Sequence, residues 1–202
     1  MREESELLVA THNEGKTREL VELLAGTPLK LRGLSELPWI EEAEETGATF
    51  AENAVLKARH YGSLSGLRTL ADDSGLAVDA LGGEPGIYSA RYGGREISYA
   101  ERMALLLEAL DATGDRERRA RFVCVIALAD PRTGEVETFE GVCEGRIADA
   151  PRGTGGFGYD PLFVPEGFTQ SFGELPSEIK QRLSHRARAL SKARQFLLRG
   201  ER

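Results

Sequence analysis

Two adjacent carboxylates in the first half of the chain are the residues whose type and spacing point most directly to chemistry. Asp72 and Asp73 follow the short apolar run at 68–71 and precede a Ser-Gly pair. Carboxylate oxygens are hard ligands that suit Mg²⁺, and a carboxylate facing a cleft can instead orient an attacking water. A bound cation would offset the repulsion between two side chains at the end of a strand. The alternative is an Asx turn, because DDSG is also good turn chemistry.

A hydroxyl, a carboxamide and an ammonium group lie close together in THNEGK, residues 11–16. Thr11, Asn13 and Lys16 can donate to phosphate oxygens, and Lys16 would supply the main charge. The segment lies between a predicted strand and a predicted helix, where loop amides and a helix N-terminus favour an anion. It lacks the spacing of a Walker A loop. The alternative is an ordinary strand-to-helix turn in which Asn13 caps the helix.

Two later segments carry aromatic and cationic side chains. Phe157 and Tyr159 stand among glycines in GGFGYDP, which favours backbone close to a flat ligand with a ring to stack on it. The alternative is a loop held down by a buried Phe. His185 and Arg186 follow Ser184 at a predicted helix start, where they can donate to a carbonyl acceptor or stand exposed as cap residues.

The elements that must position these residues follow from periodicity and capping. Helices alternate with strands early in the chain, and a hairpin comes late, so we predict an α/β fold with a long mixed sheet and flanking helices. Capping boxes at Thr49/Glu52 and Ser98/Glu101 each begin a helix. Further helices are predicted at 17–26 and 184–198. Strands are predicted at 6–10, 29–34, 68–71, 75–81, 119–130 and 135–147, the last two joined by PRTG.

Composition narrows the class of protein. The chain has 202 residues, of which 41% are hydrophobic and 29% charged, so a packed core is expected. The net charge of −7 argues against a general nucleic-acid binder. The acidic N-terminus does not resemble a signal peptide and no apolar run is long enough to span a membrane, so we predict a cytoplasmic protein. Cys124 and Cys143 are predicted to be buried free thiols rather than a disulfide.

Together these segments provide phosphate donors, metal carboxylates, a stacking ring and base-edge donors. On that basis the chain resembles the inosine triphosphate pyrophosphatase family, whose members hydrolyse triphosphates of deaminated purines. ADDSGL followed by PGIYSARY is the most specific part of the resemblance, and His12 stands where many members carry a glycine. The matching segments run in family order from residue 7 to residue 190: LLVATHNEGKTREL, EETGATFAENAVLKA, ADDSGLAVDALGGEPGIYSARY, GTGGFGYDPLF and SHRARAL.

The resemblance implies a role for each matching residue. It implies that Asp73 is both a Mg²⁺ ligand and the base for water, and that Glu45, in the acidic run at 41–48, is a second ligand. It also implies a phosphate contact from Lys57 and a substrate contact from Ser74. The implied triphosphate loop is Thr11, His12, Asn13, Glu14, Gly15 and Lys16. The implied nucleoside contacts are Phe157, Gly158, Tyr159, Asp160, Lys180, His185 and Arg186.

The implied fold is a single nucleoside triphosphate pyrophosphatase domain, residues 1–202, with two lobes around a deep cleft, in a homodimer. The implied reaction converts ITP, dITP or XTP and water to the monophosphate and pyrophosphate, with Mg²⁺ as cofactor. Arg186 is then expected to donate to the 6-oxo group of the base while Phe157 stacks on the ring. Two alternatives stay open, a Maf-like pyrophosphatase for modified pyrimidine nucleotides and a nucleotide sensor without turnover.

Overall fold

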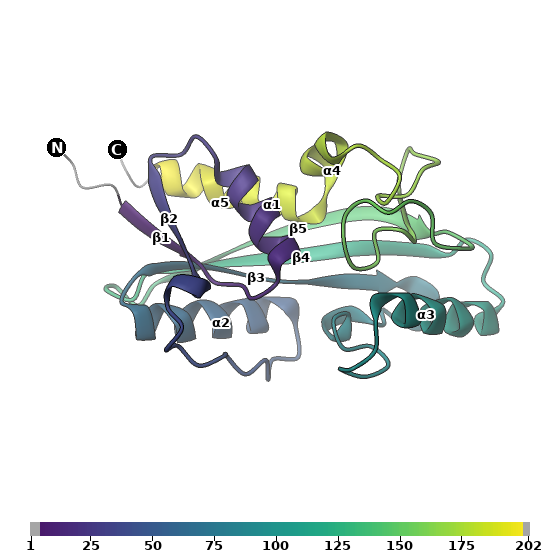
Figure 1. Ribbon diagram of the computed structural model, residues 1–202, viewed down its shortest axis with the longest axis horizontal. Coiled ribbons are helices and arrows are strands. Elements are labelled where there is room, and N and C mark those ends of the chain that lie inside the picture. Colours follow the sequence, from purple (N-terminus) through teal and green to yellow (C-terminus); the bar gives the residue numbers. More distant parts are fainter. Residues whose placement is uncertain (1–4, 200–202) are drawn as a thin grey trace. The chain divides into compact units, whose positions relative to one another are not determined.

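The structure, a computed structural model, describes residues 5–199 and contains one six-stranded sheet (Figure 1). The strand order is β2-β1-β3-β4-β5-β6. β1 pairs in parallel with β2 and with β3, whereas β5 and β6 are antiparallel. The predicted mixed sheet is therefore confirmed. The strands are β1 (Ser5–Val9), β2 (Leu29–Gly33), β3 (Arg68–Val78), β4 (Arg119–Ala129), β5 (Val136–Ile147) and β6 (Phe163–Pro165).

The helices begin where local capping signals stand in the sequence. Both predicted capping boxes form, with the side chains of Thr49 and Ser98 accepting from the backbone N–H three residues on. The first helix begins at Glu14 rather than at the predicted residue 17, because Asn13 caps it. The α-helices are α1 (Glu14–Leu24), α2 (Phe50–Ser65), α3 (Tyr99–Thr113), α4 (Ser177–Leu183) and α5 (His185–Arg199). Three short 3-10 turns are η1 (Leu34–Glu36), η2 (Asp79–Leu81) and η3 (Gly86–Tyr88).

The predicted strand boundary at the two aspartates is also wrong. The sequence predicts that a strand ends at Asp72 and Asp73, or that they form a turn, but β3 runs without a break from Arg68 to Val78. Successive side chains of a strand point to opposite faces of the sheet. The adjacent carboxylates therefore leave the strand in opposite directions.

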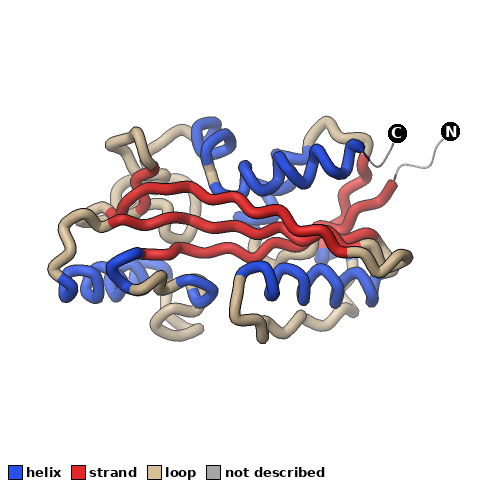
Figure 2. Tube along the Cα trace, turned by 180° about the vertical axis from the view of Figure 1, so that it is seen from behind, coloured by secondary structure: helices blue, strands red, loops and turns tan. Residues whose placement is uncertain are grey.

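The chain divides into two compact units, which we describe separately. Of the residues that the structure describes, unit 1 comprises 5–73, 124–141 and 186–199, and unit 2 comprises 74–123 and 142–185. In unit 1, α1 and α5 lie on one face of the strands and α2 lies on the other (Figures 1 and 2). Each face has its own apolar cluster, one including Leu20 and Leu190 and the other including Ala58 and Tyr61. The prediction of a single domain with a cleft between two lobes stays a prediction.

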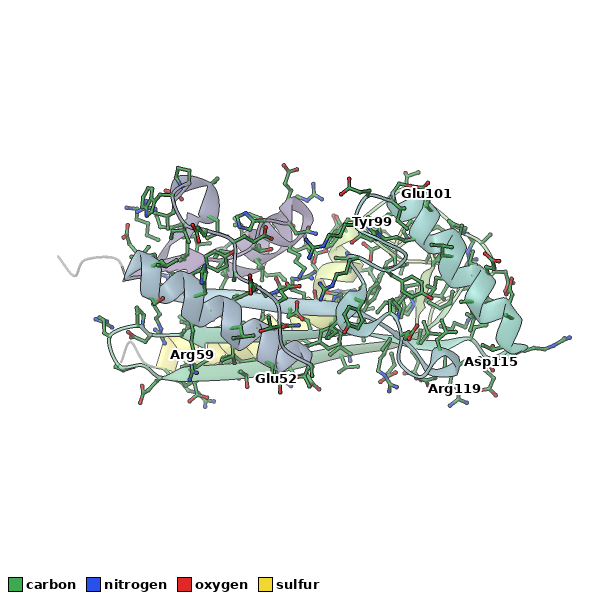
Figure 3. The ribbon with its side chains drawn as sticks, turned by 90° about the horizontal axis from the view of Figure 1, so that it is seen from below. Glu52, Arg59, Tyr99, Glu101, Asp115 and Arg119 are labelled. Carbon is green, nitrogen blue, oxygen red and sulfur yellow. The ribbon has the colours of Figure 1, made fainter. Side chains whose placement is uncertain are left out.

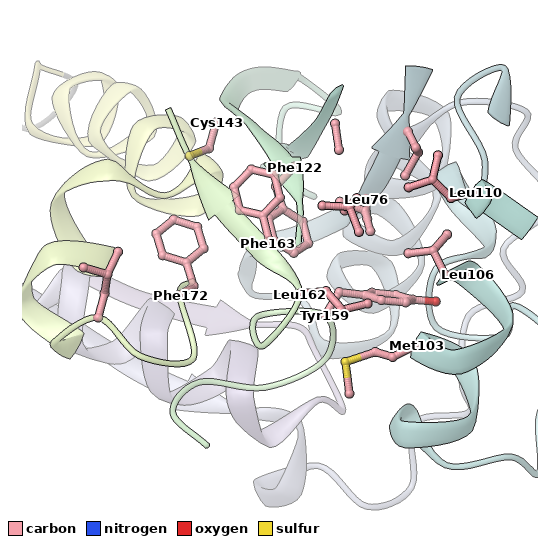
Figure 4. Close-up of a cluster of buried hydrophobic side chains, with 14 residues drawn as sticks. Leu76, Met103, Leu106, Leu110, Phe122, Cys143, Tyr159, Leu162, Phe163 and Phe172 are labelled. Atoms are coloured by element: carbon pink, nitrogen blue, oxygen red, sulfur yellow. The ribbon is translucent and has the colours of Figure 1, made fainter. Parts of the chain in front are cut away.

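Unit 2 has a separate, more aromatic core (Figure 4). It gathers Phe122, Phe163 and Phe172 with leucines from β3 and α3. The ring centroids of Phe122 and Phe163 lie 4.6 Å apart, and those of Phe163 and Phe172 lie 5.5 Å apart. Aromatic side chains bury large apolar areas, so this cluster stabilises unit 2.

Both cysteines are free and buried, as predicted, with Cys124 in unit 1 and Cys143 in unit 2. Burial, as the largest cause, and the nearby Asp72 raise the pKa of the Cys124 thiol to about 12. Within residues 5–199, none of the helices has the length and apolar character needed to cross a membrane.

Candidate active site

The predicted phosphate loop lies between β1 and α1 in unit 1. The Asn13 side chain accepts a hydrogen bond from the backbone N–H of Lys16, at 3.0 Å, and its own backbone N–H donates to Thr11 Oγ1 at 3.2 Å. Asn13 is thus the helix cap, as in the ordinary strand-to-helix alternative. The same geometry presents the first turn of α1 with Lys16 in it, so a phosphate contact remains compatible with the cap. Glu14 is the first residue of α1.

Asp72 leaves β3 on the face that carries α1 and α5, and it lies within a buried network of charges. Lys16 Nζ is 3.0 Å from Asp72 Oδ2, and Arg186 Nη2 is 3.3 Å from the same oxygen. Arg186 also forms an ion pair with Glu19. Burial opposes the ionised carboxylate, but Lys16 and Arg186 outweigh it and hold the pKa of Asp72 well below its usual range.

Asp73 leaves β3 on the opposite face, toward α2. Lys57 Nζ lies 2.8 Å from Asp73 Oδ1 and 2.9 Å from Glu45 Oε1, so one ammonium group bridges two carboxylates. The Asn53 amide lies 3.4 Å from Asp73 Oδ2. Burial raises the pKa of Asp73 even though the charge of Lys57 opposes this. Burial lowers the pKa of Lys57, but the nearby carboxylates outweigh it and raise the pKa overall.

These two environments change the interpretation of the aspartate pair. The sequence suggested that one divalent cation offsets the repulsion between adjacent carboxylates at a strand end. In the structure each carboxylate has its own cations, Lys16 and Arg186 for Asp72, and Lys57 for Asp73. The two residues therefore have different chemistry available to them, with Asp72 fixed in ion pairs and Asp73 beside a second carboxylate.

The residues around Asp73 fit a magnesium ion. Glu45 and Asp73 both offer hard oxygen ligands and already converge on one positive group, the ammonium of Lys57. No cluster of three or more His, Cys, Asp or Glu side chains suited to a metal occurs among residues 5–199. Mg²⁺ is commonly held by one or two carboxylates together with substrate phosphates and water, so two carboxylates are sufficient.

The glycine-rich loop in unit 2 is organised by one carboxylate. Asp160 Oδ2 accepts from Lys180 Nζ at 2.6 Å and from the backbone N–H of Phe157 at 2.7 Å. Lys180 Nζ also lies 4.5 Å from the centroid of the Phe157 ring, within cation–π range. A side chain at Gly156, whose φ is +69°, would overlap Asp160 Oδ2. The loop therefore depends on glycine beside the carboxylate that fixes Phe157 and Lys180.

Three of the predicted nucleoside contacts are buried and interact with other residues of the protein. Tyr159 is buried and donates to the backbone oxygen of Ser89 at 3.1 Å, which makes it a core residue. His185 is buried against the Phe122 ring, at 4.7 Å between centroids. Arg186 is 1% exposed and donates to Asp72 and Glu19. The alternative that His185 and Arg186 are exposed cap residues is therefore wrong, and base reading by Arg186 stays a prediction.

The remaining predicted residues occupy less constrained positions. His12 is exposed, with Nε2 3.2 Å from the Tyr61 hydroxyl. Ser74 follows Asp73 in β3 and is half-buried. Gly15 lies in the first turn of α1, and Gly158 has a φ of +64° in the loop before Tyr159.

Sequence reasoning missed several residues that contact predicted site residues, and three of them contact charged or polar groups of unit 1. Glu19 pairs with Arg186, Asn53 contacts Asp73, and Tyr61 contacts His12. A signal for two of them is present, because Asn53 and Tyr61 stand four residues before and four after Lys57 in α2. That spacing places all three side chains on one helix face.

The chain is similar to known proteins over nearly its whole length. A family model described as the Ham1 family matches residues 7–196. The chain is 50% identical over 185 residues to the dITP/XTP pyrophosphatase of Geobacter sulfurreducens, covering 92% of both proteins. It is 52% identical over 185 residues to that of Thermus thermophilus, covering 91% of this chain and 87% of the relative. The structure of a HAM1 protein from Coxiella burnetii matches with a TM-score of 0.89 and 42% identity, covering 96% of this chain and 99% of the other.

Proposed function

Since the chain belongs to the Ham1 family, we propose that it hydrolyses non-canonical purine nucleoside triphosphates, dITP, ITP and XTP, to the monophosphate and pyrophosphate. The observation that carries the proposal is the bridge from Glu45 through Lys57 to Asp73, at 2.9 Å and 2.8 Å. The bridge brings together two carboxylates that fit Mg²⁺ and one cation that fits a phosphate. The chain that carries it is 50% and 52% identical to two dITP/XTP pyrophosphatases.

In unit 1, Asp73 acts on the attacking water, and Lys16 and Lys57 act on the triphosphate. Asp73 orients and deprotonates the attacking water, and its raised pKa makes it a stronger base than an exposed carboxylate. Lys16 and Lys57 contact phosphate oxygens and offset charge on the leaving pyrophosphate. Asp72 holds Lys16 in place, since the two side chains are 3.0 Å apart.

Glu45 and Asp73 would hold the magnesium ion. When bound, Mg²⁺ supplies positive charge that stabilises the developing charge on the phosphates. In unit 2, Phe157 provides the stacking ring and Asp160 with Lys180 provides polar groups for the nucleoside. We further propose that the enzyme works as a homodimer in the cytoplasm on free nucleotides.

The test is a pyrophosphate-release assay with Mg²⁺ over ITP, XTP, ATP, GTP and modified pyrimidine triphosphates. We expect ITP and XTP to exceed ATP by more than about tenfold in kcat/KM, since a site built around a polar group can reject an analogue that lacks it by up to about 10⁴-fold. Preference for a modified pyrimidine would favour a Maf-like enzyme. Binding of ITP without turnover would identify a nucleotide sensor.

A further inference from the structure

The acidic segment at 41–48, which carries Glu45, forms hydrogen bonds to one face of α2 at regular intervals. The backbone N–H of Ala43 donates to the Tyr61 hydroxyl at 3.2 Å. Glu45 Oε1 accepts from Lys57 at 2.9 Å. The backbone N–H of Gly47 donates to Asn53 Oδ1 at 2.8 Å. Alternate residues of the segment (43, 45 and 47) are thus bound by residues spaced four apart in the helix (61, 57 and 53). The segment and the helix run in opposite directions along these contacts.

The spacing explains why these contacts stay in register. Two residues of an extended chain advance about 6.6 Å, and four residues of a helix rise about 6 Å. Figures 1 and 2 show the segment before α2 running alongside that helix. Side chains at positions 53, 57 and 61 of the helix share one face, so each meets the next alternate residue of the segment.

Asn53 and Tyr61 also contact the rest of the site. Asn53 is fully buried, and its amide nitrogen lies 3.4 Å from Asp73 Oδ2. The Tyr61 hydroxyl lies 3.2 Å from Nε2 of His12 in the phosphate loop. A side chain at Gly47 would meet Glu52 Cβ at 2.6 Å and Asn53 Oδ1 at 2.8 Å, so the segment lies tightly against the helix at this point.

We propose that Asn53 and Tyr61 are positioning residues that hold Glu45 beside Asp73. Lys57 alone is not sufficient for this, because its ammonium group is shared between the two carboxylates and, in the proposed reaction, turns to a phosphate. The two hydrogen bonds from the segment's backbone, at Ala43 and Gly47, flank Glu45 and do not depend on Lys57. They keep the two metal ligands together when Lys57 changes partner.

The inference rests on the proposed function and is tested with Tyr61→Phe and Asn53→Ala. Tyr61→Phe keeps the ring and removes only the hydroxyl. Arg59→Ala is the matched control, because Arg59 lies on an exposed part of the same helix (Figure 3). Two quantities are measured, the Mg²⁺ concentration for half-maximal turnover of ITP, and the rise in Tm caused by Mg²⁺ with inorganic pyrophosphate.

We expect both test variants to need about threefold or more Mg²⁺ for half-maximal turnover, since each loses a hydrogen bond that holds a ligand. kcat should fall more than KM changes, and the rise in Tm should shrink, while Arg59→Ala behaves as wild type. An unchanged Mg²⁺ requirement in Tyr61→Phe overturns the inference, whether or not Asn53→Ala folds.

The Tm measurement separates this inference from the proposed function, because it needs no turnover. If wild type does not hydrolyse ITP, the proposed function fails, and the Tm shifts of wild type and Tyr61→Phe decide the inference alone. A wild type whose Tm does not respond to Mg²⁺ with pyrophosphate overturns it.

Discussion

At the scale of single residues, the two adjacent aspartates show how position in a strand separates chemical roles. Asp72 is surrounded by cations, which lower its pKa, whereas burial raises the pKa of Asp73. A carboxylate that is stabilised in its ionised form is a weak base, and one that is destabilised is a stronger base. Asp73 is therefore the one suited to activating water.

We predict that Asp73→Asn lowers kcat by about 10² to 10⁴-fold, the usual cost of losing a general base. Its stability at pH 7 should change little, because relief from burying an ionised carboxylate is offset by the loss of the 2.8 Å ion pair with Lys57. Steady-state pyrophosphate release and urea unfolding measure the two effects. A variant that keeps more than about a tenth of wild-type kcat would contradict the assigned role.

We predict that Arg186→Ala mainly costs stability. Its guanidinium is 1% exposed and pairs with Asp72 and Glu19, so its removal takes one of two cations from the buried Asp72 and breaks the ion pair with Glu19. Breaking such a pair costs about 3–5 kcal/mol. Urea unfolding measures this, with Arg188→Ala, an exposed residue of the same helix, as a control expected within about 0.5 kcal/mol of wild type.

The same variant tests the base-reading prediction. If Arg186→Ala is as stable as Arg188→Ala but its ITP/ATP ratio collapses, Arg186 reads the base and the structural role is wrong.

At the scale of elements, local signals in the sequence predict most boundaries. The capping boxes at Thr49 and Ser98 and the apolar runs of β1, β4 and β5 depend on neighbouring residues, so the sequence alone is enough. The continuity of β3 is different, because DDSG favours a turn locally. The cations that stabilise its carboxylates come from α1, α2 and α5, which no local pattern reveals.

In the candidate site, too, the local sequence reveals some residues and not others. The donors in residues 11–16 and the Asp pair follow from residue types, whereas Lys57 and Lys180 came only from the family resemblance. Asn53 and Tyr61 act through a segment whose path along α2 is not evident from periodicity.

The glycine-rich loop at 153–161, before β6, offers a test at this scale. Gly153 has a φ of +77°, and a Cβ there would overlap the backbone oxygen of Gly173. We predict that Gly153→Ala costs about 1–3 kcal/mol more than Gly134→Ala, since overpacking against backbone adds to the strain. Gly134 is a matched control because its φ is +76° and a Cβ at that position would have open space for 4 Å around it. Equal losses in urea unfolding would mean that crowding at Gly153 is unimportant.

At the scale of the whole molecule, three strands contribute residues to both units. Three of the four boundaries between the units fall within strands, after Asp73 in β3, after Val123 in β4 and after Gly141 in β5, and the fourth falls after His185, the first residue of α5. These strands are neighbours in one hydrogen-bonded sheet. Each of these strands continues without a break from one unit into the other, so unfolding of one unit leaves the strands of the other without their continuation, and we expect the two units to unfold together.

The two cysteines can show whether the units unfold together, because Cys124 lies in unit 1 and Cys143 in unit 2. We predict that neither thiol reacts with a disulfide reagent in the native protein, since both are buried and the pKa of Cys124 is raised to about 12. In Cys124→Ala and Cys143→Ala, each with one remaining thiol, labelling through a range of urea concentrations gives the free energy of opening at that thiol. Each value should equal the free energy of global unfolding of the same variant. If one thiol becomes reactive at a free energy several kcal/mol below the global value, its unit opens alone, and the shared strands do not couple the units.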